Sequence, residues 1–327
     1  MILHPIVLVS ARRRGFLALL LVGALLGCRD RGVERRGAQV SPTRKEHRPL
    51  DPASLGQDPL TTLRALRMPA HRVVTSLGSF RLTCSSRLVT ELSGHPRQEI
   101  VQQVSARVDE KGQYAALKTT HPQYGHEVIW TGGWLYPRLR WNRYVRRRPA
   151  EDEPPRLLDR LTGLLPAYVG LLRRFVAVEL VGRETYAGRE SVRIKLRLAA
   201  TPGAPPPEEQ PSRLWRRTLI VSHLEGEAHL EARTGAPLHA ELVARWSFHA
   251  PAPEPLPSSG IPQQADSNLV GKTELRFSLK ISELGLVPPI KPPPEAETVH
   301  SPRLTRTEIE RQMLTGELPL EESWGPP

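Results

Sequence analysis

The side chains that could hold a metal or act as nucleophiles are histidines and cysteines. His121 and His126 flank a turn, and we do not interpret this pair alone as a metal site. His229, His239 and His249 alternate with apolar residues, which places them on the solvated face of a strand. The sequence contains no Gly-x-Ser-x-Gly elbow, His-Glu-x-x-His helix or glycine-rich phosphate loop. We therefore predict no catalytic residue, no metal and no cofactor, and expect the protein not to be an enzyme.

The two cysteines have different surroundings. Cys84 shares an alternating apolar stretch with Phe80 and Leu82, so we expect an inert thiol that points toward the core. Cys28 ends an uncharged run, residues 15–28, that follows three arginines. A helix of that length spans about 21 Å, which is short of the ~30 Å hydrocarbon core of a bilayer. This segment is therefore typical of a signal peptide.

The order of basic patch, short apolar run, Gly27 and Cys28 resembles the lipobox of bacterial lipoproteins. The resemblance implies a signal peptide at residues 1–27 and a mature N-terminus at Cys28 that carries acyl chains such as palmitate. Two or more acyl chains give stable anchoring. The implied location is the bacterial cell envelope, where the protein is lipid-anchored at the periplasmic face or the outer membrane. The implied partner is the membrane itself.

Residues 134–148 combine arginines with Trp134, Tyr136, Trp141 and Tyr144. Such a mixture could stack on single-stranded nucleic acid, but an exported protein meets little of it, so we predict no nucleic-acid partner. Anionic lipid headgroups are the better match, at ~1 kcal/mol for each basic residue near a charged membrane. The alternative is a strand with a solvated cationic face. The anionic-surface candidates are Arg138, Arg140, Arg143, Arg146, Arg147 and Arg148.

Composition sets the broad class. The chain has 327 residues, 39% of them hydrophobic, which suffices for a core. The 46 basic and 34 acidic side chains give a net charge of +12. Two cysteines exclude a disulfide-dense scaffold. The 33 prolines without a glycine period point to long irregular connections.

Strict alternation of apolar and polar residues is the dominant pattern, and it predicts half-buried β-strands. It occurs in residues 80–88, 99–109, 191–198, 238–249 and 274–282. Glycine-containing turns at 110–112, 187–189 and 234–237 predict hairpins, and hence an antiparallel sheet.

The turn at 234–237 also suggests a register. Pairing Ala232 with Leu238 would place three opposite-charge pairs on the polar face of the hairpin. These pairs are His229 with Glu241, Glu231 with His239, and Glu225 with Arg245.

One segment, residues 155–175, has helical spacing instead of alternation. Leu157, Leu161 and Leu164 begin an apolar stripe with steps of three and four that continues to Phe175. Glycine and proline inside it predict a kinked helix or two short ones. Residues 161–172 carry no charge, so the segment must be largely covered or must itself cover an apolar surface.

These patterns predict a mainly β (α+β) fold. We expect a strongly curved antiparallel sheet or incomplete β-barrel with a helical lid, preceded by a signal peptide and a flexible tether. The expected organisation is a signal peptide at 1–27, a lipidated N-terminus and disordered tether at 28–60, and a curved β domain at 61–287. A helical insertion occupies 155–175, and a proline-rich tail with a possible short helix occupies 288–327.

Two stretches of the body suggest a family. Residues 181–196 form a hairpin with a glycine turn, and residues 231–241 contain two strand segments joined by the sequence Thr-Gly-x-Pro. They resemble the LolA/LolB-like lipoprotein-carrier superfamily, and the resemblance could span residues 60–286. It implies an apolar cavity that shelters acyl chains. It carries no specific binding residue over to this chain.

Two functions follow as hypotheses. The first is an envelope lipoprotein that binds or transfers lipid or acylated protein in an apolar cavity between sheet and helical lid. The second is a non-enzymatic structural or assembly lipoprotein with a filled core, which binds another envelope component through its arginine-rich strand or proline-rich loops. The lipid-cavity candidates are Phe80, Leu82, Val104, Trp130, Leu164, Tyr168, Leu171, Trp246, Phe248 and Phe277.

Overall fold

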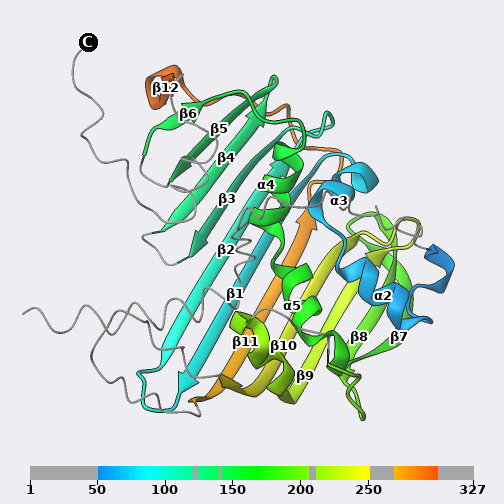
Figure 1. Ribbon diagram of the computed structural model, residues 1–327. Coiled ribbons are helices and arrows are strands. Elements are labelled where there is room, and N and C mark those ends of the chain that lie inside the picture. The colour runs from blue at the N-terminus through cyan, green and yellow to red at the C-terminus, as the bar shows by residue number, and fades with distance from the viewer. Residues whose placement is uncertain (1–50, 121–123, 140–141, 206–210, 251–268, 301–327) are drawn as a thin grey trace, which may run out of the picture.

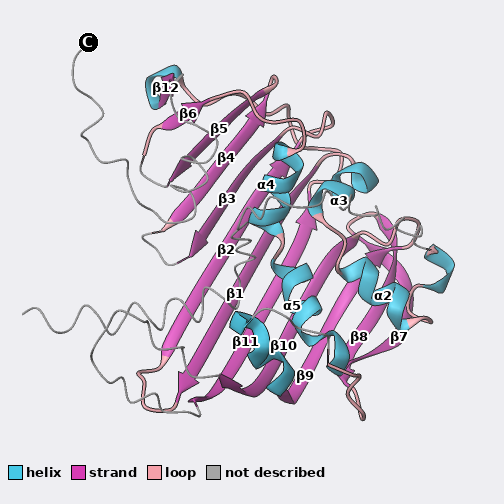
Figure 2. Ribbon diagram, in the orientation of Figure 1, coloured by secondary structure: helices cyan, strands magenta, loops and turns pink. Residues whose placement is uncertain are grey.

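The computed structural model describes residues 51–120, 124–139, 142–205, 211–250 and 269–300. The described residues form a ten-stranded antiparallel sheet with four α-helices on one of its faces (Figures 1 and 2). The expected signal peptide and the lipidation site Cys28 lie outside these ranges, as do His121, Arg140 and residues 301–327 with the possible short helix.

The sheet has the strand order β5-β4-β3-β2-β1-β11-β10-β9-β8-β7. Because β5 and β7 are its two edges, the sheet is open, which confirms the predicted curved antiparallel sheet and excludes a closed barrel within the described residues. A separate parallel pair joins β6 to β12. The strands are β1 (Phe80–Leu92), β2 (Gln98–Val108), β3 (Tyr114–Thr120), β4 (Gly125–Thr131), β5 (Trp134–Leu139), β6 (Tyr144–Arg146), β7 (Val176–Tyr186), β8 (Arg189–Leu198), β9 (Ile220–Glu231), β10 (Pro237–Ala250), β11 (Leu269–Ser282) and β12 (Thr298–His300).

The chain crosses from one edge of the sheet to the other through the segment expected to be helical. This crossing contains α4 (Glu153–Thr162), α5 (Leu164–Leu172) and the 3-10 helix η2 (Arg173–Phe175). The sequence predicted a kinked helix or two short ones, and the structure has the second of these. The break falls at Gly163, where a Cβ would lie 2.5 Å from the carbonyl oxygen of Asp159.

The two faces of the sheet differ as the alternation predicts. Cys84 pairs with Val104 on one side and with Leu279 on the other, and all three side chains are buried under the helices. The opposite face carries ion pairs, such as Arg87 to Glu99 at 2.7 Å. At the centre of the sheet, one face therefore supplies the main core while the other meets water.

The predicted register of the β9–β10 hairpin is wrong by two residues. His239 pairs with His229, and the expected pairing with Glu231 does not occur. The turn closes earlier along the chain than expected, because the backbone N–H of Glu231 donates to the carbonyl of Ala236 at 2.8 Å. The expected His229–Glu241 and Glu225–Arg245 cross-strand pairs are lost with it, since Glu241 faces Glu227. An even shift keeps every side chain on its expected face.

Two helices precede the sheet, and the sequence patterns gave no signal for them. They are α2 (Pro59–Leu66) and α3 (Ala70–Leu77), preceded by the 3-10 helix η1 (Pro52–Ser54). Asp58 caps α2, because its carboxylate accepts the N–H groups of Leu60 and Thr61, each at 3.1 Å. Leu55 is buried in the core. Residues 51–60, which were expected to belong to the tether, are thus structured and partly buried.

Parts of the proline-rich stretches are also ordered. The 3-10 helix η3 (Pro211–Thr218) buries Trp215, whose ring lies 5.3 Å from that of Phe248. After β11, Ile290 joins a small second core with Ile129 of β4 and Tyr136 of β5, and its carbonyl accepts a 2.7 Å hydrogen bond from the hydroxyl of Thr131. The 3-10 helix η4 (Glu295–Glu297) then leads into β12. The beginning of the expected tail therefore packs against the sheet.

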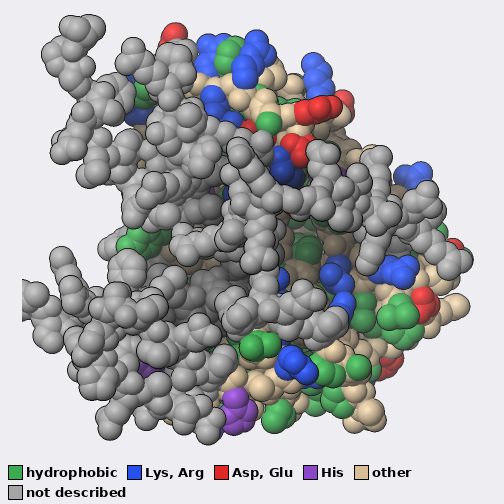
Figure 3. All heavy atoms as spheres, viewed as in Figure 1, with side chains coloured by type: hydrophobic (Ala, Val, Ile, Leu, Met, Phe, Trp, Pro, Cys, Tyr) green, Lys and Arg blue, Asp and Glu red, His purple; other side chains and the backbone are tan. Residues whose placement is uncertain are grey.

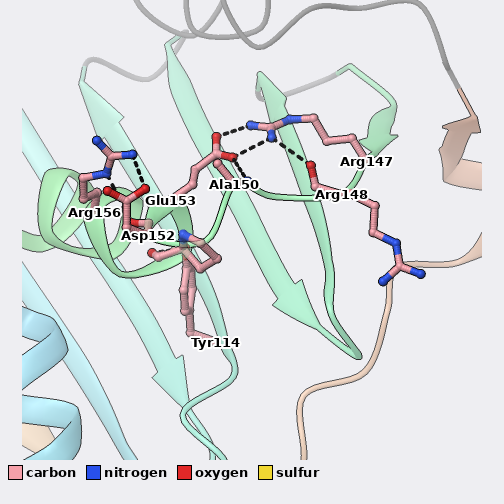
Figure 4. A network of polar contacts seen from close by, with 8 residues as sticks. Tyr114, Arg147, Arg148, Ala150, Asp152, Glu153 and Arg156 are labelled. Atoms are coloured by element: carbon pink, nitrogen blue, oxygen red, sulfur yellow. Dashed lines mark hydrogen bonds and ion pairs between the residues drawn. The ribbon is translucent and has the colours of Figure 1, made fainter.

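Charged side chains are visible on the face of the molecule that Figure 3 shows, but the start of the crossing is fixed by an ion pair that is buried. Glu153, the first residue of α4, accepts hydrogen bonds from both terminal nitrogens of Arg147, with Nη1 to Oε2 at 2.7 Å (Figure 4). The side chains of Arg147 and Glu153 are only 11% and 3% exposed. The Tyr114 hydroxyl donates to the carbonyl of Pro154 at 2.8 Å. Arg147, which follows β6, and Tyr114 of β3 thus hold the first turn of α4.

Replacing Arg147 by Met should destabilise the fold by about 3–5 kcal/mol, because the buried Glu153 carboxylate loses its guanidinium partner. The double variant Arg147→Met/Glu153→Met should recover most of this loss. As a control, Arg156→Met removes an exposed ion pair with Asp152 and should cost less than about 1 kcal/mol. Urea unfolding of the full chain, followed by tryptophan fluorescence, measures all three. Equal losses in Arg147→Met and Arg156→Met would contradict this role of the buried pair.

Cys84 should resist alkylation in the folded protein. Burial raises the pKa of its thiol to about 12, so at pH 8 it holds roughly a thousandfold less thiolate than a thiol of ordinary pKa. Iodoacetamide labelling, mapped to Cys84 by peptide mass spectrometry, should be slow in buffer and fast in urea. Equal rates in the two conditions would show that this thiol is not buried.

Candidate functional site

A cavity of about 500 Å³ lies between the helices and the inner face of the sheet. Its floor is apolar and consists of Leu82 from β1 with Leu279 and Ile281 from β11, each at most 5% exposed. These side chains are neighbours because Leu82 and Ile281 are register partners. The floor therefore belongs to the centre of the sheet, where β1 and β11 join its two halves.

The walls come from two helical segments. Leu165, Ala167 and Leu171 of α5 form one wall, and Met68 and Val73 of the α2–α3 region form the other. Residues 161–172 carry no charge, so α5 can present apolar atoms both to the core and to this cavity. Ala167 is exposed, which leaves room above the floor.

The cavity also has basic side chains. Arginines from the end of α2, from η2 and from η3 take part in its lining, and Asp159 of α4 is the single carboxylate among the described lining residues. The arginines are Arg67, Arg173, Arg174 and Arg216. In Figure 3, Lys and Arg side chains are visible between α5 and α2, the region where the cavity lies. Apolar floor and cationic lining thus occur in one site.

The ten lipid-cavity candidates all belong to the main core, but only Leu82 and Leu171 line the cavity. Trp130 and Leu171 are partly buried, and the other eight are fully buried. Tyr168 shows why. Its hydroxyl donates to Ser86 at 3.1 Å, and its ring meets that of Phe277 edge-on at 5.6 Å. Most of the interface between α5 and the sheet is therefore packed, and the open volume is confined to one side of α5.

Several anionic-surface candidates are occupied within the protein. Arg138 pairs with Glu127 at 2.8 Å and with Glu297 at 3.2 Å, while Arg147 pairs with Glu153. Arg143 donates to the carbonyl of Ala296 at 2.6 Å.

The guanidinium groups of Arg146 and Arg148 each lie 4.0 Å from the ring centre of Trp134. Arg140 lies outside the described residues. The aromatic residues of this segment thus hold arginines in place.

The histidines form no metal site within the described ranges, where no three His, Cys, Asp or Glu side chains are grouped to hold an ion. Burial, with a contribution from the charge of Lys118, lowers the pKa of His126. His229 is buried on the outer face between Glu184 and Glu227, at 3.2 and 3.3 Å. Burial lowers the pKa of His239, which stacks near Tyr186.

The arginines of the cavity were not among the residues predicted from the sequence, because they lie in separate segments. Arg67 follows a helix of only eight residues, and Arg216 lies next to a proline-rich stretch. Arg173 and Arg174 had a signal, since they end the uncharged run abruptly.

Among the described helices, none has the length and hydropathy to cross a bilayer.

No protein-family model matches the chain, and no curated protein matches it. Among solved structures, it is similar to a LolA superfamily protein from Nitrosomonas europaea, with 12% identity, 74% of this chain and 96% of that chain covered, and a TM-score of 0.19. It is also similar to the lipoprotein LppX from Mycobacterium tuberculosis, with 13% identity, 71% of this chain and 99% of that chain covered, and a TM-score of 0.26. A third similar structure is a putative outer membrane lipoprotein-sorting protein domain from Vibrio parahaemolyticus, with 9% identity, 79% of this chain and 99% of that chain covered, and a TM-score of 0.20. These values are low, so the fold assignment rests on the strand order and register of the chain itself. The solved structures to which the chain is similar thus include a LolA superfamily protein and a putative lipoprotein-sorting protein domain.

Proposed function

We propose that this protein is a membrane-anchored envelope lipoprotein that binds or transfers lipid, or the acyl group of a lipoprotein, in the cavity beside α5. The observation that carries the proposal is an open cavity over an apolar floor in the middle of the sheet. Its volume, about 500 Å³, falls in the ~300–1,000 Å³ range of small-ligand sites. An acyl chain is the ligand that such a floor favours.

The driving force in this proposal is the removal of methylene groups from water, at ~0.8 kcal/mol for each buried CH₂. Leu82, Leu279 and Ile281 would contact the chain from below, and Leu171 from the side. Hydrophobic contacts have no fixed direction, so the floor tolerates chains of different length. This suits a protein that accepts and releases its ligand.

Anchoring through Cys28 is the second part of the proposal. It rests on the resemblance of residues 1–28 to the lipobox. An anchored carrier would meet lipid or acylated protein at the membrane surface, and the cavity would give an acyl chain an apolar environment outside the bilayer.

The packed interface around Tyr168 favours a second candidate function, a structural or assembly lipoprotein with a filled core. In that case the cavity would hold only solvent, and the protein would act by binding another envelope component. The arginines stacked on Trp134 offer such a surface, because Arg148 is positioned without a carboxylate partner among the described residues. Ligand binding at the cavity separates the two functions.

The substitution Ala167→Phe should block the cavity, because residue 167 lies on an exposed position of the wall. We expect binding of cis-parinaric acid, measured by its fluorescence with the full chain carrying Cys28→Ser, to weaken at least about tenfold, or 1.4 kcal/mol. Ala177→Phe on β7 is the matched control, since Ala177 is exposed and does not line the cavity. Unchanged affinity in Ala167→Phe, or no binding by the parent, would favour the filled-core alternative.

Radioactive palmitate should label the chain expressed in a bacterium with a lipoprotein pathway, and the Cys28→Ser variant should lose essentially all of this label. Cys84→Ser serves as the control and should keep the label, because Cys84 is buried. Equal labelling of the parent and the Cys28→Ser variant would disprove anchoring through this residue.

A further inference from the structure

The arginines of the cavity come from three separate parts of the chain. Arg67 follows α2, Arg173 and Arg174 follow α5, and Arg216 belongs to η3. The fold brings them to a single cavity. Arg67 lies against α5, because a Cβ at Gly170 would be 3.7 Å from its Nε atom.

The lining offers these arginines little negative charge. Asp159 is already engaged, because it accepts the backbone N–H of His71 at 3.0 Å and lies 2.6 Å from Nδ1 of the same residue. Arg174 donates to the carbonyl of Leu219 at 2.9 Å and lies 4.4 Å from the ring centre of Phe175. Arg67 and Arg173 have no side-chain hydrogen bond or ion pair with any described residue.

The electrostatics of Arg67 follow from this arrangement. Partial burial lowers its pKa, and the positive charge of Arg173 lowers it further. The two guanidinium groups repel each other, and the exposed position of both residues lets a ligand reach them. An anion between them would relieve the repulsion and accept hydrogen bonds from both.

We propose that the ligand of this cavity is an anionic amphiphile, with a carboxylate or phosphate headgroup held by Arg67 and Arg173 and its acyl chain lying on the floor of Leu82, Leu279 and Ile281. The inference rests on the proposed function, and it adds that the headgroup charge decides which lipids bind. Neutral lipids of equal chain length bind more weakly. A phosphate ester and a fatty-acid carboxylate share the chemistry that guanidinium groups recognise.

The test compares cis-parinaric acid with its methyl ester, which has the same chain and no charge. Full chain carrying Cys28→Ser is titrated with each probe at pH 8, and the same titrations are made with Arg67→Gln/Arg173→Gln. We expect the acid to bind the parent at least about tenfold more tightly than the ester, a difference of 1.4 kcal/mol. In the double variant the acid should weaken to the level of the ester, while the ester keeps its affinity and so reports an intact cavity.

Arg64→Gln is the matched control, because Arg64 is an exposed arginine in the last turn of α2 that does not line the cavity. It should leave the binding of both probes unchanged. Inorganic phosphate is added as a competitor to distinguish a headgroup from a free anion, and up to millimolar concentrations it should not displace the acid.

The outcomes separate this inference from the proposed function. If acid and ester bind the parent equally, or if the acid keeps its affinity in the double variant, the headgroup inference is wrong and acyl binding stands. If neither probe binds the parent, the proposed function fails. If phosphate alone binds in an arginine-dependent manner and neither probe does, the cavity is a site for free anions and the lipid headgroup is excluded.

Discussion

The structure depends on covering one apolar face of a ten-stranded open sheet. Nine spacings of ~4.8 Å give a width of roughly 43 Å, whereas α4 and α5 together span roughly 30 Å at ~1.5 Å per residue. The connection between the two edges can therefore cover only part of this face, even when curvature brings the edges closer. The helices α2 and α3 cover another part. The cavity lies where these two covers meet, between α5 and the α2–α3 region.

The composition of α5 follows from this position. A helix that only covered a sheet would carry polar residues on its outer side, but residues 161–172 have none that are charged. Leu164 and Leu172 pack into the core, while Leu171 lines the cavity. The one polar group that enters the packed side, the hydroxyl of Tyr168, is satisfied by Ser86. The same helix can thus fill the core on one side and border an open volume on the other.

The sequence predicted those strands in which apolar and polar residues alternate along the chain. Strands β1, β10 and β11 alternate because each has one face on the core and one in water. The edge strand β7 does not, since Leu180 and Val181 are adjacent and both exposed. In β3, Lys118 occupies an inner position beside Val104 and breaks the pattern. The helices α2 and α3 have eight residues each, and two turns give too few apolar positions to show a helical period.

The candidate site was harder to predict because it depends on which charges meet. The sequence draws attention to the arginines of residues 134–148, which are dense and interleaved with aromatics. Two of them already have carboxylate partners in the fold. Arg138 pairs with Glu127 of β4, and Arg147 pairs with Glu153 at the start of α4. Arg67 and Arg173 are sparse in sequence, yet the fold places them together over an apolar floor with no free carboxylate among the described lining residues. Whether an arginine is available to a ligand is thus decided by the partners that tertiary structure provides, so local charge density is a poor guide to an anion site and the distribution of carboxylates is a better one.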